Sequence, residues 1–189
     1  MDPNEINHIR AAQQGDRRAF DALIQLHERR TLQVIVGIVG DRDDAHDVFQ
    51  NTFIRAWTKL RTFRFESAFG TWITRIAINQ ALNQRKKRRW KQRLSLDALR
   101  AERPVQEPTT TKEPMADLMN TELGDRITSS MDALSDRERA VFTLKHMHGY
   151  KIREIAAMID CAEGTVKNYL FRATQKMRSA LQPYYEHAG

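Results

Sequence analysis

Cysteine, proline and glycine are scarce in this chain, which has one, five and eight of them among 189 residues. The single cysteine, Cys161, excludes an internal disulfide and fits a reducing compartment. The longest apolar run, Val34 to Val39, has only six residues, so the sequence offers no membrane span. The N-terminus lacks the basic start and apolar core of a secretion signal, and we expect a cytoplasmic protein.

Acidic residues are in the minority, with 24 Asp and Glu against 31 Lys and Arg, which gives a formal charge of +7. A positive balance favours a polyanionic partner, either nucleic acid or a membrane surface. The hydrophobic fraction of 41% is sufficient for packed cores. The composition therefore predicts a folded protein with an anionic partner.

Strand-like alternation is also missing, and the helical spacing of apolar residues predicts an all-α fold. Four helices, the second over residues 17–39, form a first domain at residues 1–94. Residues 95–116 hold three of the five prolines and are expected to be a flexible linker. Extended, these residues reach roughly 70–80 Å. A second helical domain follows at residues 117–189, with a capping box at Ser135 and Glu138.

Residues 149–172 are the most informative stretch, because they predict two short helices joined by a tight turn at Asp160 and Cys161. Such a unit places its second helix in the major groove of DNA. An ordinary helical hairpin with a solvated basic side is the alternative. The face expected to contact DNA comprises Thr165, Lys167, Asn168, Tyr169, Arg172 and Lys176, with Arg178 nearby.

Aromatic and basic residues gather in two further clusters. Six of the fifteen aromatic residues lie between Phe53 and Trp72, interleaved with arginines, and several of them fall in a predicted loop. Aromatic side chains in such a loop suit stacking on unpaired bases, although they could equally form a loop core. Residues 85–93 place seven positive charges in nine positions, which attracts nucleic acid unless the run is simply a solvated tail.

Together these stretches resemble bacterial RNA polymerase sigma factors of the sigma-70 family, of the extracytoplasmic-function (ECF, group 4) type. Residues 15–20, 44–53, 63–78 and 154–172 carry the resemblance, in the family's order. It implies a region 2 helical bundle, a linker and a region 4 helix-turn-helix, in an alternative sigma factor that directs core polymerase to specific promoters and helps to open the strands. No catalytic residue, metal or cofactor is implied.

The resemblance also assigns residues to partners. The solvent face of the third helix would bind the clamp helices of the largest polymerase subunit without internal partners, through Asp43, Asp44, Asp47, Gln50 and Asn51. Region 4 would contact the polymerase flap and read the minus-35 element through the recognition face above. Single-stranded minus-10 DNA would be held by Arg61, Phe63, Arg64, Phe65, Ser67, Arg75, Asn79, Asn83, Arg85 and Lys86. At the start of the helix-turn-helix, Lys151 stands where the family usually has a capping Ser.

Control is expected to come from outside the chain. Members of this family are commonly held inactive by an anti-sigma factor, often membrane-anchored, and the linker would let both domains fold around it. Two other functions remain open. One is a free-standing helix-turn-helix regulator that grips duplex DNA unaided. The other is an enzyme or metal site built on Cys161, His146 and His148.

Overall fold

The structure, a computed structural model, describes residues 2–99 and 122–187. Every regular element in these two segments is helical, in agreement with the all-α prediction. In chain order they are α1 (Pro3–Gln13), α2 (Arg17–Val39), α3 (Arg42–Lys59), the short 3-10 helix η1 (Leu60–Thr62), α4 (Phe69–Leu99), α5 (Glu122–Asp132), α6 (Asp136–Phe142), the short π-helix η2 (Thr143–Met147), α7 (Ile152–Ile159) and α8 (Glu163–His187).

The first three helices begin at aspartates that cap them. Asp2, Asp16 and Asp41 each accept a hydrogen bond from a backbone N–H two or three residues further on. α2 ends at Gly40, which adopts a left-handed conformation with φ of 84°. These signals place α2 at the residues that the sequence predicts.

Helices α1 to α4 form an N-terminal block around a core rich in aromatic residues. η1 and the loop after it close one end of this core. Its buried side chains are Ile9, Ala12, Ala19, Phe20, Leu23, Phe53, Ala56, Leu60, Phe63, Phe69 and Ile73. The aromatic residues between Phe53 and Trp72 therefore help to build the fold as well as to line its surface.

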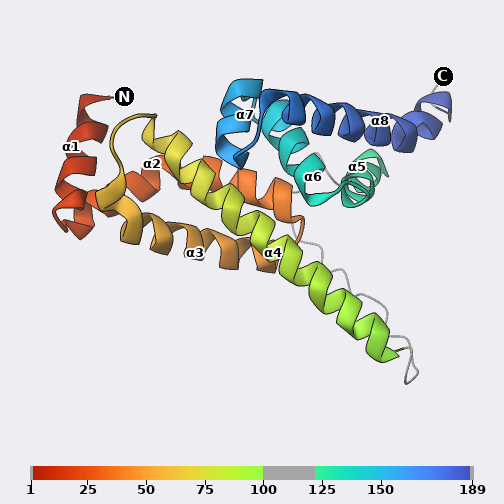
Figure 1. Cartoon of the computed structure of the whole chain (residues 1–189), viewed down its shortest axis with the longest axis horizontal. Coiled ribbons are helices and arrows are strands. Elements are labelled where there is room, and N and C mark those ends of the chain that lie inside the picture. The colour runs from red at the N-terminus through yellow and green to blue at the C-terminus, as the bar shows by residue number, and fades with distance from the viewer. Residues whose placement is uncertain (1, 100–121, 188–189) are drawn as a thin grey trace.

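The last turns of α4 project beyond the other helices (Figure 1). The sequence predicts a linker over residues 95–116, whereas α4 continues to Leu99. No proline occurs between Pro3 and Pro104, so nothing in the sequence stops the helix at residue 94. The rest of the predicted linker and the start of the predicted second domain lie outside the described residues.

Helices α5 to α8 form a C-terminal block with a small core of Met131, Leu134, Ala173 and Met177. The predicted capping box at the start of α6 is confirmed. The Ser135 hydroxyl accepts a hydrogen bond from the Glu138 N–H at 3.3 Å, and the Glu138 carboxylate accepts one from the Ser135 N–H at 2.9 Å.

The two blocks pack directly against each other. The C-terminal block lies against α2 and α4 (Figure 1). A third core spans both blocks, and its members include Val34, Ile35, Ile38, Ala77, Ile78 and Ala81 on one side and Val141, Leu144, Tyr150, Ile155, Met158 and Ile159 on the other. The sequence treats the blocks as separate domains and does not predict this contact.

Candidate nucleic-acid interface

α7, the following turn and α8 have the predicted helix-turn-helix geometry. Asp160 takes the left-handed conformation that the turn requires, with φ of 54°. Ile155, Ile159 and Val166 are buried between the two helices and the N-terminal block. The two helices are therefore held rigidly with respect to each other.

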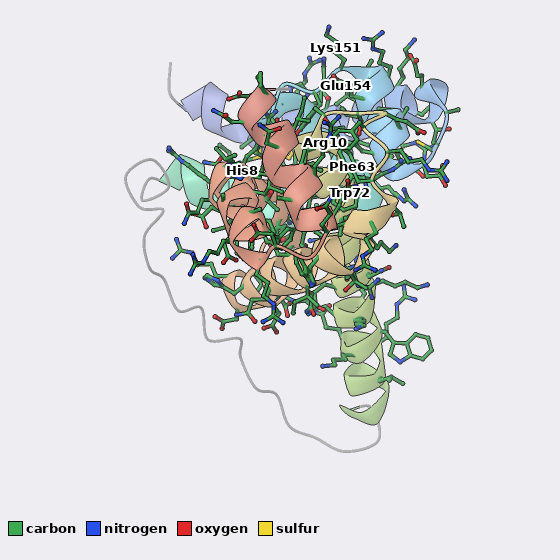
Figure 2. The ribbon with its side chains drawn as sticks, turned by 90° about the vertical axis from the view of Figure 1, so that its left-hand side faces the viewer. His8, Arg10, Phe63, Trp72, Lys151 and Glu154 are labelled. Carbon is green, nitrogen blue, oxygen red and sulfur yellow. The ribbon has the colours of Figure 1, made fainter. Side chains whose placement is uncertain are left out.

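The start of α7 is capped by a glutamate. The Glu154 carboxylate accepts a hydrogen bond from the backbone N–H of Lys151 at 2.7 Å, and Figure 2 shows both residues at the edge of the molecule. This contact is one half of a capping box, and it needs only the backbone of Lys151. A lysine at this position is thus compatible with the start of the helix.

On α8, some residues of the predicted recognition face are exposed to solvent, and others contact the rest of the protein. Lys167, Asn168 and Arg172 are exposed, while Thr165 and Tyr169 are half-buried and Tyr169 packs on the shared core. Phe171, which is not among the predicted contact residues, is 63% exposed. It lies four residues after Lys167, on the same helix face, and that spacing could have identified it.

Lys176, also on the predicted recognition face, forms an ion pair within the protein. Its ammonium lies 2.7 Å from the Glu138 carboxylate, which is almost fully buried. Burial alone would raise the pKa of Glu138, but hydrogen bonds from Lys176 and Ser135 outweigh it and hold the pKa below its ordinary value. In this structure Lys176 supports α6 from α8.

The loop after η1 is held by a cluster of tilted and edge-on aromatic rings, which the loop shares with the start of α4. Phe63 is only 5% exposed, and its ring centroid lies 5.0 Å from Phe65, 5.4 Å from Phe69 and 5.3 Å from Trp72. Figure 2 shows Phe63 and Trp72 side by side. From α1, the amide of Gln13 donates hydrogen bonds to the carbonyl oxygens of Leu60 and Phe63, which hold the loop in place.

Phe65 has the unusual backbone conformation of this loop. Its φ is 62°, a region that costs a bulky side chain about 1–2 kcal/mol. Its ring is half-buried, with one side on Phe63. The loop therefore presents a fixed aromatic surface with Phe65 at its edge, suitable for stacking by an unpaired base.

Most of the remaining predicted minus-10 residues are exposed, namely Arg61, Arg64, Ser67, Arg75, Asn79, Asn83 and Lys86. Arg85 differs from its neighbour Lys86, because its guanidinium is turned towards the C-terminal block and its side chain is only 10% exposed. The Arg85 Nε donates to the Asp136 carboxylate at 2.6 Å. The basic run thus has one face in solvent and one face in a protein contact.

The predicted acidic surface lies on α3, where Asp43, Asp47, Gln50 and Asn51 are exposed. The expectation that these acids lack internal partners is wrong for Asp44. Its carboxylate accepts a hydrogen bond from the Gln84 amide at 2.6 Å and lies 3.6 Å from Arg88. The surface is therefore braced by α4 at its N-terminal end and open along the rest of α3.

The residues of the enzyme alternative do not form a cluster. Within residues 2–99 and 122–187, no group of three or more His, Cys, Asp and Glu side chains could hold a metal ion. His148 is half-buried, and burial together with the nearby Arg30 lowers its pKa.

The described helices also include none that is long and apolar enough to cross a membrane.

Two family profiles match the chain. The first is described as sigma-70 region 2 and matches residues 23–91, and the second is described as sigma-70, region 4 and matches residues 124–177. The chain is 32% identical to the RNA polymerase sigma-H factor of Pseudomonas aeruginosa over an alignment 195 residues long, which covers 95% of each chain. It is 32% identical to the ECF RNA polymerase sigma-E factor of Haemophilus influenzae over 190 residues, covering 93% of this chain and 94% of that protein.

Solved structures share the fold. The sigma factor RpoE, in complex with the anti-sigma factor NepR from Bartonella quintana, has a TM-score of 0.67 at 23% identity and covers 86% of this chain and 96% of its own. CnrH, in complex with the cytosolic domain of CnrY, also has a TM-score of 0.67, at 24% identity, and covers 96% of this chain and 99% of its own.

Proposed function

This chain belongs to the sigma-70 family of RNA polymerase sigma factors, and on that premise we propose which of its surfaces carry out the steps of initiation. It is an alternative sigma factor of the ECF type that acts in transcription initiation. The acidic surface of α3 binds core polymerase, the aromatic loop captures an unpaired minus-10 base, and α8 reads the minus-35 element. The protein contributes no catalytic step of its own and works in the cytoplasm.

The observation that supports these assignments is the exposure of three chemically different surfaces in the order that the resemblance expects. The α3 acids, the Phe65 edge and the basic face of α8 all reach solvent in the same structure. Capturing a base costs a few kcal/mol of unstacking, which aromatic contact can return. Lys167 and Arg172 supply the positive charge that duplex DNA requires.

The test of the polymerase assignment is complex formation with core enzyme. The wild-type chain should co-elute with core polymerase in gel filtration, and Asp47→Arg should weaken that complex because it reverses a charge on the exposed α3 surface. Asp21→Arg is the matched control, since Asp21 is an exposed acid on α2. Tight, sequence-specific duplex binding by the protein without polymerase would favour the free-standing regulator instead.

An anti-sigma factor is the proposed inhibitory partner. Two of the structural relatives were solved in complex with NepR and CnrY, the former named as an anti-sigma factor. Such a partner would cover the acidic surface of α3 and the recognition face of α8, and in this family it is often membrane-anchored. Expression of the chain alone in a heterologous bacterium that carries its target promoter should give constitutive transcription. Silence relieved only by a small molecule or metal would contradict external inhibition.

A further inference from the structure

α1 lies outside the part of the chain that the region 2 profile matches, which begins at residue 23. The helix packs against α2 and η1, beside the loop that joins η1 to α4 (Figure 1). Ile9 and Ala12 bury its inner face in the aromatic core. None of the residues assigned to polymerase or DNA lies on α1, yet α1 contacts the loop that carries several of them.

Gln13, the last residue of α1, bridges two carbonyl groups at the start of this loop. Its Nε2 donates to the carbonyl oxygen of Leu60 at 3.1 Å and to that of Phe63 at 2.9 Å. An amide NH2 group carries two hydrogens, so one side chain can make both bonds. Leu60 begins η1 and Phe63 follows it, so Gln13 ties the two ends of this turn together.

The end of α1 fixes the place of Gln13. Gly15 adopts a left-handed conformation with φ of 103°, and the Asp16 N–H donates back to the Ala11 carbonyl at 3.1 Å, which terminates the helix. Gln14 is exposed, whereas Gln13 is half-buried. Two glutamines that are adjacent in the sequence therefore differ in what surrounds them.

The far end of the loop is also supported from α1, through His27 of α2. The His27 Nε2 lies 2.8 Å from the Glu5 carboxylate of α1, and both side chains are mostly buried. The His27 and Phe69 ring centroids are 5.5 Å apart. A Cβ atom at Gly70 would lie 3.0 Å from the His27 Nδ1, so the first turn of α4 packs closely on this ring. α1 thus supports the loop at its start through Gln13 and at its end through Glu5.

Phe65 is the part of the loop that most needs this support. Its φ of 62° is unfavourable for a bulky side chain, and such a conformation persists only where the surrounding structure holds it. Part of that support is the ring of Phe63, whose centroid lies 5.0 Å away. Phe63 is itself held through its carbonyl group by Gln13. The position of the Phe65 ring therefore depends on a side chain of a different helix.

We propose that Gln13 is a positioning residue for base capture, which holds the loop so that Phe65 is in place to receive an unpaired base. This inference rests on the proposed function of the loop. A base that leaves the duplex loses stacking and pairing, and a surface that is already ordered returns more of this cost than one that must first be ordered. Gln13 acts through Phe65 on strand opening, and it does not affect the binding of core polymerase or of the minus-35 element.

Adjacent glutamines provide a matched test of this role. Gln13→Met removes the two donors and keeps a side chain of similar length, and Gln14→Met is the control at the exposed position. Holoenzyme with Gln13→Met should open a promoter that the wild type transcribes about tenfold more slowly, because two hydrogen bonds to the loop are lost. Permanganate reactivity of unpaired thymines measures the opening rate. Core binding and duplex promoter binding should remain at the wild-type level, and Gln14→Met should match the wild type throughout.

Gln13→Glu is a stronger change at the same position. It keeps the shape of the side chain but turns an acceptor towards two carbonyl oxygens, so it should slow opening more than Gln13→Met does. Opening as fast in Gln13→Glu as in Gln14→Met would contradict the hydrogen-bonding role.

Amide hydrogen exchange of the free protein tests the same contact without DNA or polymerase. In the wild type, the Phe63 N–H donates to the Leu60 carbonyl at 3.0 Å. Exchange over residues 63–66 should be faster in Gln13→Met, while exchange within α2 should not change. Unchanged exchange in the loop would overturn the proposal. Faster exchange throughout the N-terminal block would also overturn it, because Gln13 would then support general stability and not the loop.

A double variant determines whether Gln13 acts through Phe65. Phe65→Gly removes the ring and should itself slow strand opening. If Gln13 positions this ring, Gln13→Met should slow the Phe65→Gly protein by less than about twofold, because residues that act as one unit have non-additive effects. Effects of the two substitutions that multiply would overturn the proposal, since Gln13 would then act independently of Phe65.

Failure of the proposed function would look different from failure of this inference. In the first case, the wild-type chain would not direct core polymerase, or Phe65→Gly would open the promoter as fast as the wild type. In the second case, both of those results would be as expected, and Gln13→Met would equal Gln14→Met. A pre-melted promoter bubble should restore initiation by Gln13→Met, because this template needs no opening. A defect that persists on the bubble would contradict a role in base capture.

Discussion

The aromatic loop and the recognition helix, both assigned to DNA, are built on opposite plans. In the loop, Phe63 is 5% exposed and Phe69 is fully buried, so the aromatic side chains that define the surface also hold it together. On α8, the exposed side chains that we assign to DNA, Lys167, Asn168 and Arg172, play little part in the fold, and Phe171 is 63% exposed. The DNA-facing surface of the loop is thus fixed by packing, whereas α8 is a rigid helix whose exposed side chains are free to move.

This difference teaches where function can be separated from stability. A substitution on the exposed face of α8 should change DNA reading alone, since surface changes usually alter stability by less than about 0.5 kcal/mol. A substitution in the loop should disturb both, except at its edge.

The largest effect is expected at the centre of the loop. Phe63→Ala removes a buried ring that touches three other aromatic side chains, and we expect a loss of about 3–5 kcal/mol in the free energy of unfolding. Denaturant unfolding followed by circular dichroism measures this loss. Phe171→Ala is the matched control and should leave the unfolding midpoint unchanged. Equal stability of the two variants would break the comparison.

The next effect is on DNA binding by α8. Arg172→Ala should weaken binding of the polymerase complex to promoter DNA by about 1–3 kcal/mol, because an exposed arginine is removed from the reading face. Its unfolding free energy should match that of the wild type. Binding titrations with intact and scrambled minus-35 elements measure the loss. A variant that binds both templates as the wild type does would remove Arg172 from the reading face.

Phe65, at the edge of the loop, combines features of both surfaces, because its ring is partly packed and partly exposed. Phe65→Gly relieves a φ of 62° and removes a half-buried ring, so these opposing changes should keep the change in unfolding free energy within about 1 kcal/mol. Strand opening should be impaired while duplex promoter binding is retained. A pre-melted promoter bubble should restore initiation, and failure of that rescue would exclude base capture by Phe65.

The smallest effect concerns Lys176, which the structure pairs with Glu138. The pKa of folded Glu138 lies below its ordinary value, so its pairing stabilises the protein at neutral pH and is lost as pH falls through the folded pKa. Lys176→Met should therefore flatten the decrease of Tm between pH 7 and pH 3. At neutral pH the loss should be about 0.5 kcal/mol or less, because Lys176 is 45% exposed and screened by solvent. A pH profile identical to that of the wild type would show that the pair is unimportant.

Helical periodicity and capping residues predict much of the fold. Asp16 and Gly40 bracket α2 at the predicted residues, and the turn between α7 and α8 falls at Asp160 as predicted. These features are local, and the sequence carries them directly. The assignment of individual side chains to DNA and polymerase remains a prediction.

The contact between the blocks could not be predicted in the same way. Ala77, Ile78 and Ala81 read as core residues of their own helix, and periodicity cannot say which helix covers them. Arg85 and Lys86 are adjacent in one basic run, yet a rotation of about 100° on the helix sends one into an interface and the other into solvent. Such distinctions depend on packing between distant segments.

That distance along the chain also sets an order of events during synthesis. Arg139 lies 102 residues after Gly37, whose carbonyl it caps. At about 5–20 residues per second, a ribosome needs roughly 5–20 s to make the intervening chain. For that interval the nascent N-terminal block carries an uncovered apolar face around Val34 and Ile78. The C-terminal block, which is synthesised later, covers this face and protects it from aggregation.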